Sequence, residues 1–198
     1  DEIENVIAAG AKRIMLPMWK SASEVNAFLT SVNKRVATTL LLETKEAVAC
    51  LDAVLENPLV EEIHIGLNDL HLSYGLSFMF ELLSNGTVEL LCNKIRARGI
   101  PYGFGGIARI GEGLLPAERI LCEHIRLKSE RVILSRAFFD SRQIISPNVA
   151  KSVFATEVKK LREKELECAE YSSEQLQLLH SDTSNIIAQI ASQKRKAQ

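Results

Sequence analysis

Two acidic residues stand where apolar segments of this 198-residue chain end. Glu43 follows the run Thr39–Leu42, and Asp69 comes soon after the apolar segment Ile63–Ile65. A carboxylate beside a buried strand is costly to remove from water unless it has a partner. We therefore interpret Glu43 and Asp69 as functional residues, separated by about one strand-helix-strand repeat.

Acids at the same end of neighbouring parallel strands can reach one cation, because such strands lie about 4.8 Å apart. Mg²⁺ prefers oxygen ligands in octahedral geometry and commonly takes one or two carboxylates, with water or substrate oxygens at the other positions. Glu43 and Asp69 are thus predicted to hold Mg²⁺ or Mn²⁺ and to leave room for a bidentate 2-oxo acid. The alternative is that each acid only caps the helix that follows it.

The segment around the second acid adds a candidate substrate site. Gly66 would let the backbone approach a ligand closely. The amides at Asn68 and Asp69 would then be free to bind a carboxylate. His71 is close enough in sequence to act on the same ligand, although a structural role for it is the alternative.

A second polar segment, Gly103–Gly113, follows the fourth predicted strand and is rich in glycine. It is predicted to be a loop that could close over a ligand, with Arg109 pairing with an anion. Alternatively, it is a surface loop in which Arg109 forms an ordinary ion pair. Beyond the candidates His71 and Arg109, no catalytic residue can be assigned.

Helical and strand patterns alternate along the first part of the chain, as in α/β proteins. Helices are predicted at 1–9, 23–32, 45–55, 88–98 and 117–128, and strands at 13–18, 36–43, 62–66, 100–104 and 131–135. Such a series predicts a parallel sheet with right-handed crossovers, either an open doubly wound sheet or a barrel. No GxGxxG motif follows a strand, and acids at strand ends favour the (β/α)8 TIM-barrel type.

Five predicted strands are too few for a complete barrel. We therefore expect residues 1–140 to be the C-terminal part of a (β/α)8 barrel that lacks its first three βα units. Residues 141–198 are expected to form a helical extension, with Ser172 and Gln175 as a capping box at the start of the last helix. That extension either packs on the outside of the barrel or forms an oligomerisation arm, and a homo-oligomer is expected.

Composition narrows the choice of partners. The formal net charge is −1, so no overall field attracts nucleic acid or an anionic membrane, and no apolar run approaches the length of a membrane span. The four cysteines form no CxxC pair, which is typical of reduced thiols. A cytoplasmic protein with a small-molecule substrate is the expectation.

Three segments resemble the HpcH/HpaI aldolase and citrate lyase beta-subunit family. They are Met15–Met18, Leu41–Ala47 and Ile65–Leu70, the last followed by Ser73-Tyr74-Gly75. The resemblance covers about residues 1–140. It implies a barrel of the phosphoenolpyruvate/pyruvate type, in which Glu43 and Asp69 match the metal-binding acids. The backbone at Gly66, Asn68 and Asp69 matches the segment that holds the substrate carboxylate.

The resemblance implies a metal-dependent carbon–carbon lyase that acts on a 2-oxo acid or an acyl-CoA through a metal-bound enolate. The family's arginine and histidine base lie on early strands, which have no counterpart among the segments found here. One alternative is a non-catalytic binding or assembly module derived from a barrel. Another is a phosphate-binding enzyme that uses the glycine-rich segment and Arg109.

Overall fold

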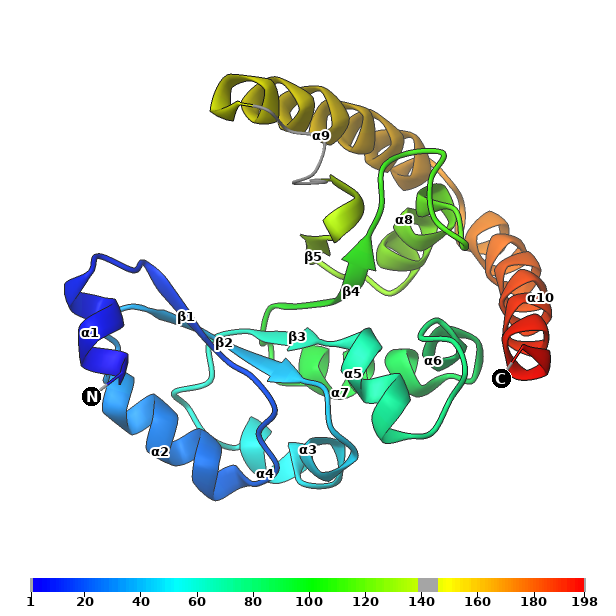
Figure 1. The fold of residues 1–198 in the computed structure, drawn as a ribbon. Helices are drawn as coiled ribbons and strands as arrows, with labels where there is room; N and C mark the ends of the chain where they lie inside the picture. Colours follow the sequence, from blue (N-terminus) through cyan, green and yellow to red (C-terminus); the bar gives the residue numbers. More distant parts are fainter. Residues whose placement is uncertain (1, 139–145, 198) are drawn as a thin grey trace.

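A computed structural model describes residues 2–138 and 146–197. Its centre is a parallel five-stranded sheet whose strands lie side by side in sequence order (Figure 1). The strands are β1 (Arg13–Leu16), β2 (Ala37–Leu42), β3 (Ile63–Ile65), β4 (Tyr102–Ile107) and β5 (Arg131–Leu134). The sheet lacks the reversal of strand order that defines a doubly wound fold. The predicted α/β class and parallel sheet are confirmed.

Ion pairs link both edges of the sheet to its centre. Arg13 on β1 and Arg131 on β5, at opposite edges, both reach the carboxylate of Glu62, which directly precedes β3. Arg13 Nη1 lies 3.2 Å from Glu62 Oε1, and Arg131 Nε donates to Glu62 Oε2. Thr39 Oγ1 donates to Glu62 Oε1 at 2.7 Å. One carboxylate at the centre of the curled sheet thus binds both of its edges (Figure 1).

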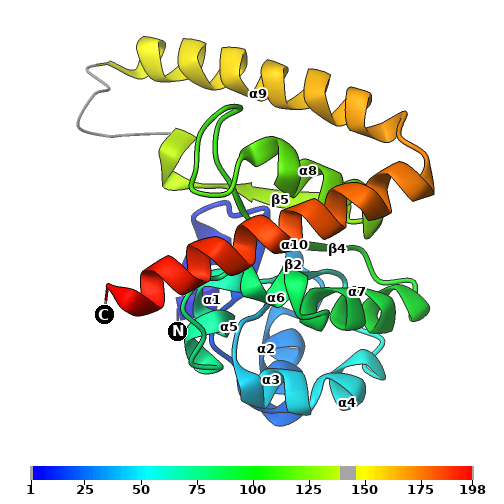
Figure 2. The same cartoon turned by 90° about the vertical axis from the view of Figure 1, so that its right-hand side faces the viewer.

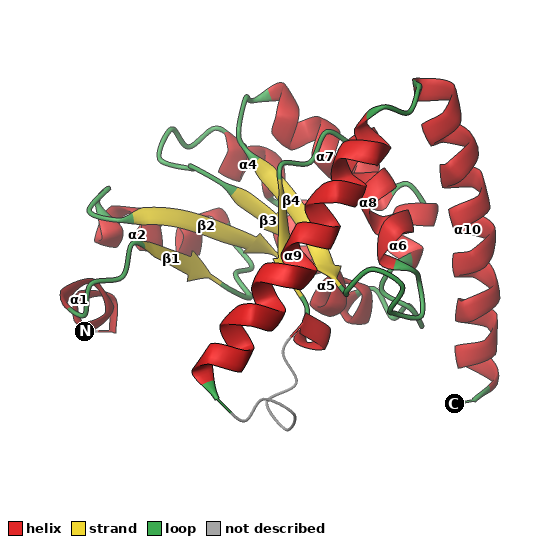
Figure 3. Ribbon diagram, turned by 90° about the horizontal axis from the view of Figure 1, so that it is seen from above, coloured by secondary structure: helices red, strands yellow, loops and turns green. Residues whose placement is uncertain are grey.

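Helices connect the strands and cover one face of the sheet (Figure 3). They are α1 (Glu2–Ala8), α2 (Ala22–Val32), α3 (Lys45–Ala49), α4 (Leu51–Leu55), α5 (Leu67–Ser73), α6 (Glu81–Ser84), α7 (Thr87–Ala97) and α8 (Ala117–Arg126). The helix predicted at 45–55 is two helices, because Cys50 leaves helical geometry with φ −104° and ψ 9°.

The glycine-rich segment is only partly a loop, contrary to the prediction. Residues 103–107 belong to β4, which pairs with β3 on one side and β5 on the other. A Cβ atom on Gly103 would collide with the carbonyl oxygen of Arg131 on β5. The glycine there is explained by the close approach of two strands rather than by a ligand.

The C-terminal helices α9 (Pro147–Ala169) and α10 (Ser173–Lys196) pack on the rest of the chain (Figure 2). α9 lies against α8, whereas α10 crosses α8 and α6 and buries Leu176, Ile187 and Ala191. Ser172 and Gln175 form the predicted capping box. The apolar stripe of α10 is therefore covered within the chain, and the expected domain boundary at 140/141 lies outside the described residues. None of the described helices is long and apolar enough to cross a membrane.

Candidate functional site

Glu43 lies directly after β2 and is 6% exposed. The backbone N–H of Met18, in the loop after β1, donates to its Oε1 at 2.9 Å. Burial raises the pKa of Glu43, the Met18 amide opposes that rise, and the nearby charge of Asp69 adds to it. The structure thus brings the two predicted acids into electrostatic contact, as the sequence indicated.

The backbone of Gly66, at the end of β3, lies against the side chain of Glu43. A Cβ atom at residue 66 would stand 2.7 Å from Glu43 Oε2 and 2.9 Å from Glu43 Cβ. Any larger residue would push the carboxylate aside. Gly66 was predicted to bring the backbone close to a ligand, and what it approaches in the structure is Glu43.

Glu43 and Asp69 line one hollow of about 420 Å³ at the carboxyl ends of β2 and β3. We call it the acid hollow; its wall also includes Met18, Lys20 and Lys45. Asp69 is exposed on α5 and has neither an ion pair nor a hydrogen bond from its side chain among the described residues. Its carboxylate is free to bind a cation from solvent.

The loop that presents the Met18 amide is held in a strained backbone conformation. Met18 has φ 52°, in the left-handed region that side chains other than glycine adopt rarely. The next residue, Trp19, is buried, and its carbonyl oxygen accepts a hydrogen bond of 2.8 Å from Thr44 Oγ1. Thr44 also caps α3, so the loop after β1 is tied to the segment that follows Glu43. Such strain persists where surrounding contacts impose it, often at functional sites.

Gly66 and Asn68 stand at the start of α5, where the sequence placed a carboxylate-binding segment. Gly66 precedes the helix and provides no side-chain cap, and the first helical hydrogen bond runs from the Leu70 N–H to the Gly66 carbonyl. The amides of Asn68 and Asp69 therefore have no acceptor among the described residues.

The other two candidates lie away from the acids. His71 is buried in α5, its Nδ1 contacts the Asn68 carbonyl oxygen, and it does not line the acid hollow. Arg109 Nη2 donates to the carbonyl oxygen of Phe138 at 3.0 Å, and its Nη1 lies 4.0 Å from Glu112. The structure therefore gives both residues structural contacts, and neither of them lines the acid hollow.

The two acids do not form a complete metal centre by themselves. Within residues 2–138 and 146–197, no group of three or more His, Cys, Asp or Glu side chains is placed to hold a metal ion. Two carboxylates in one hollow are still the donor set that Mg²⁺ uses when water or substrate supplies the other ligands.

No model of a known protein family matches the chain, and no characterised protein shows significant similarity to it.

Proposed function

We propose that this chain is part of a metal-dependent carbon–carbon lyase that acts on a 2-oxo acid or an acyl-CoA. The observation that carries the proposal is the acid hollow, where Glu43 and Asp69 meet at the carboxyl ends of neighbouring parallel strands. Chemistry at that end of the strands is characteristic of (β/α)8 barrels. Sequential strand order also supports a barrel that further βα units would complete.

The acid hollow fits a divalent cation such as Mg²⁺ or Mn²⁺. Glu43 is buried beside a second acid, and it forms no ion pair among the described residues. Hard oxygen donors of this kind suit these metals. A bound ion would supply a Lewis acid for the 2-oxo carbonyl group and stabilise the enolate that cleavage produces.

This chain's own residues would position both the ligands and the substrate. The Met18 amide fixes Glu43 Oε1, and Gly66 leaves room for the carboxylate to lie against β3. The free amides of Asn68 and Asp69 would bind the carboxylate of the substrate. A group that transfers the proton would come from the remaining βα units. We also propose that the protein forms a homo-oligomer and acts in the cytoplasm.

Calorimetry with Mn²⁺ tests the metal site directly. We expect the wild-type chain to bind one ion and the Glu43→Gln and Asp69→Asn variants to lose that binding. Glu174→Gln is the control, because Glu174 lies exposed on α10 and does not line the acid hollow. Equal binding by wild type and Glu43→Gln would rule out the proposed site.

A non-catalytic binding module is the second candidate, favoured because neither His71 nor Arg109 lines the acid hollow. Adding pyruvate or oxaloacetate to the Mg²⁺-loaded protein separates the two candidates. Binding of the 2-oxo acid that requires the metal supports the lyase, and metal binding without it supports the module. The phosphate-binding alternative has less support, because residues 103–107 are strand and Arg109 donates to the carbonyl oxygen of Phe138.

A further inference from the structure

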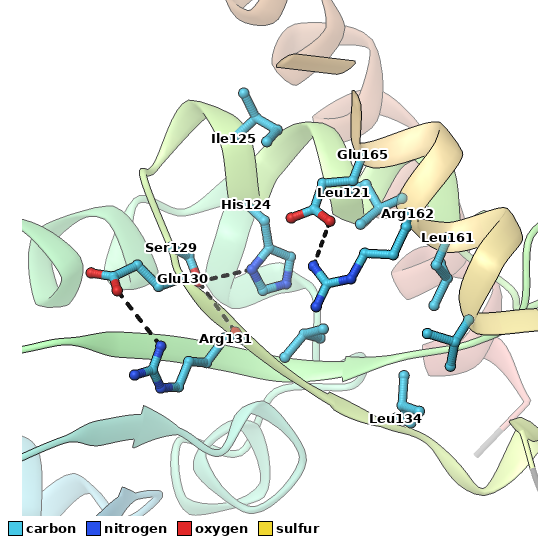
Figure 4. A pocket seen from close by; sticks show the side chains of 12 residues that line it. Leu121, His124, Ile125, Ser129, Glu130, Arg131, Leu134, Leu161, Arg162 and Glu165 are labelled. Atoms are coloured by element: carbon cyan, nitrogen blue, oxygen red, sulfur yellow. Dashed lines mark hydrogen bonds and ion pairs between the residues drawn. The ribbon is translucent and has the colours of Figure 1, made fainter. Parts of the chain in front are cut away.

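A second cavity lies between α8, β5 and α9 (Figure 4). Its volume is about 360 Å³, within the range of pockets that hold small organic molecules. We call it the outer pocket. Its apolar lining consists of Leu121, Ile125, Val132, Leu134, Val158 and Leu161. It shares no lining residue with the acid hollow.

His124 gives the outer pocket one unused hydrogen-bonding atom. The side chain is 6% exposed, and its ring stacks on Phe104 with centroids 3.8 Å apart and an angle of 2° between the planes. Nδ1 lies 2.8 Å from Ser129 Oγ, whereas Nε2 is buried and has no partner among the described residues. In Figure 4 this second ring nitrogen points away from Ser129, toward the interior of the outer pocket.

The proton of the imidazole can be assigned from its neighbours. Ser129 Oγ donates its own hydrogen to the carbonyl oxygen of Arg131 at 3.3 Å, so it accepts from Nδ1–H of His124. Burial lowers the pKa of His124 to about 3, which keeps the ring neutral at pH 7. Nε2 therefore presents a lone pair, and it needs a donor.

The charged residues at the outer pocket neutralise one another. Arg162 Nη1 lies 2.6 Å from Glu165 Oε2, and Arg131 Nη1 lies 3.6 Å from Glu130 Oε2. Neither pair leaves a net charge to attract an ionic ligand, and a charge buried among the apolar side chains would be costly.

From the cavity, its apolar lining and the unpartnered Nε2, we propose that the outer pocket binds an uncharged, mainly apolar molecule with one hydroxyl or N–H group. The apolar body lies among the side chains of α8, β5 and α9. The hydroxyl or N–H group donates to His124 Nε2. Phenol and indole have this chemistry and serve as probes.

The wild-type chain tests the proposal without any substitution. NMR titration with phenol is compared with anisole, which has the same ring but carries a methyl ether in place of the donor. Phenol is expected to bind about tenfold more tightly than anisole, as one net hydrogen bond would give. Equal affinities, or no binding of phenol, would overturn the proposal.

Two variants locate the binding. His124→Phe keeps a ring to stack on Phe104 but removes the acceptor, so it should abolish the preference for phenol. Val158→Trp should fill the outer pocket and prevent binding of both probes. Lys159→Trp is the matched control, since Lys159 is the next residue of α9 and lies outside the pocket. Circular dichroism checks that each variant is folded. If folded Val158→Trp binds phenol with wild-type affinity, the proposal is wrong.

Discussion

At the scale of single residues, Glu43 should weaken the metal-free fold at neutral pH. Its pKa is raised by burial and by Asp69, so the folded state holds the proton to higher pH than the unfolded chain does. The stability that Glu43 contributes is therefore greatest below 4.5, the ordinary pKa of a glutamate, and is lost as pH rises through the higher pKa of the folded state. Glu43→Gln keeps an oxygen acceptor for the Met18 amide. Because glutamine does not ionise, the variant should not lose stability at this position as pH rises.

Thermal unfolding between pH 4 and pH 8, without metal, measures the effect. At pH 7 we expect the Glu43→Gln melting temperature to exceed that of wild type. The two proteins should converge at pH 4. Glu46→Gln should follow wild type throughout, because Glu46 is exposed. A Glu43→Gln protein that is less stable at pH 7 would contradict the prediction.

Gly66→Ala should damage the acid hollow through steric contact alone. The backbone of Gly66 has φ −80°, which alanine adopts without strain, but the new Cβ would meet Glu43 Oε2 at 2.7 Å. We expect a loss of about 1–3 kcal/mol in urea unfolding, as for other overpacked sites, together with weaker Mn²⁺ binding.

Gly106→Ala provides the comparison for Gly66→Ala. Its Cβ would meet nothing closer than 3.6 Å, so the steric cost should be small. Replacing Glu43 by alanine in the Gly66→Ala background should recover part of the lost stability. Strictly additive effects of the two substitutions would show that the two side chains do not compete for space.

The position of the acid pair could be predicted from the sequence, whereas its surroundings could not. Glu43 and Asp69 are recognisable because each follows a short apolar strand. Nothing in the residue type of Met18 indicates a left-handed conformation or an amide aimed at Glu43. His71 was a reasonable candidate by spacing, but the helix that contains it turns the side chain to the Asn68 carbonyl.

At the scale of elements, Glu123 joins α10 to α8 through a buried ionic network. Glu123 is 1% exposed, and its Oε2 accepts hydrogen bonds of 3.0 and 2.9 Å from Nε and Nη2 of Arg126. Its Oε1 lies 2.9 Å from Nδ1 of His180 on α10. Removing Glu123 would leave the half-buried Arg126 with only Glu89 as an acidic partner.

Glu123→Ala should therefore lower the free energy of unfolding by about 3 kcal/mol, the cost of breaking a buried ion pair. Urea denaturation followed by circular dichroism measures this change. Glu163→Ala serves as the control, because the Lys159–Glu163 pair on α9 is exposed and should contribute about 0.5 kcal/mol or less. Similar losses in both variants would mean that the network does not stabilise the fold.

Periodicity predicted the order and type of most elements, but local geometry set their limits. All five strands and the two C-terminal helices lie where the pattern placed them. α5 was missed because Gly66 and the polar residues after it are typical of a loop. Its buried positions Leu67, Leu70 and His71 nevertheless have helical spacing. The contacts of Glu62 with Arg13 and Arg131 join residues distant in sequence, which no local pattern reveals.

At the scale of the whole molecule, both edges of the sheet are open within the described residues. β1 pairs only with β2, and β5 only with β4. Met15 on β1 and Ile133 on β5 are 40% and 45% exposed, unusual for apolar residues in parallel strands. Both observations are expected of a barrel sheet to which further strands would be added on either side.

Hydrogen exchange should reveal these open edges in the isolated chain. Amides of β3, which is paired on both sides and fully buried, should exchange about tenfold or more slowly than the outward-facing amides of β1 and β5. The experiment is run at two protein concentrations, because self-association through unpaired edges would protect them only at the higher one. If β1 and β5 were as protected as β3 at both concentrations, the sheet could not have open edges, and the proposal that added βα units complete a barrel would fail.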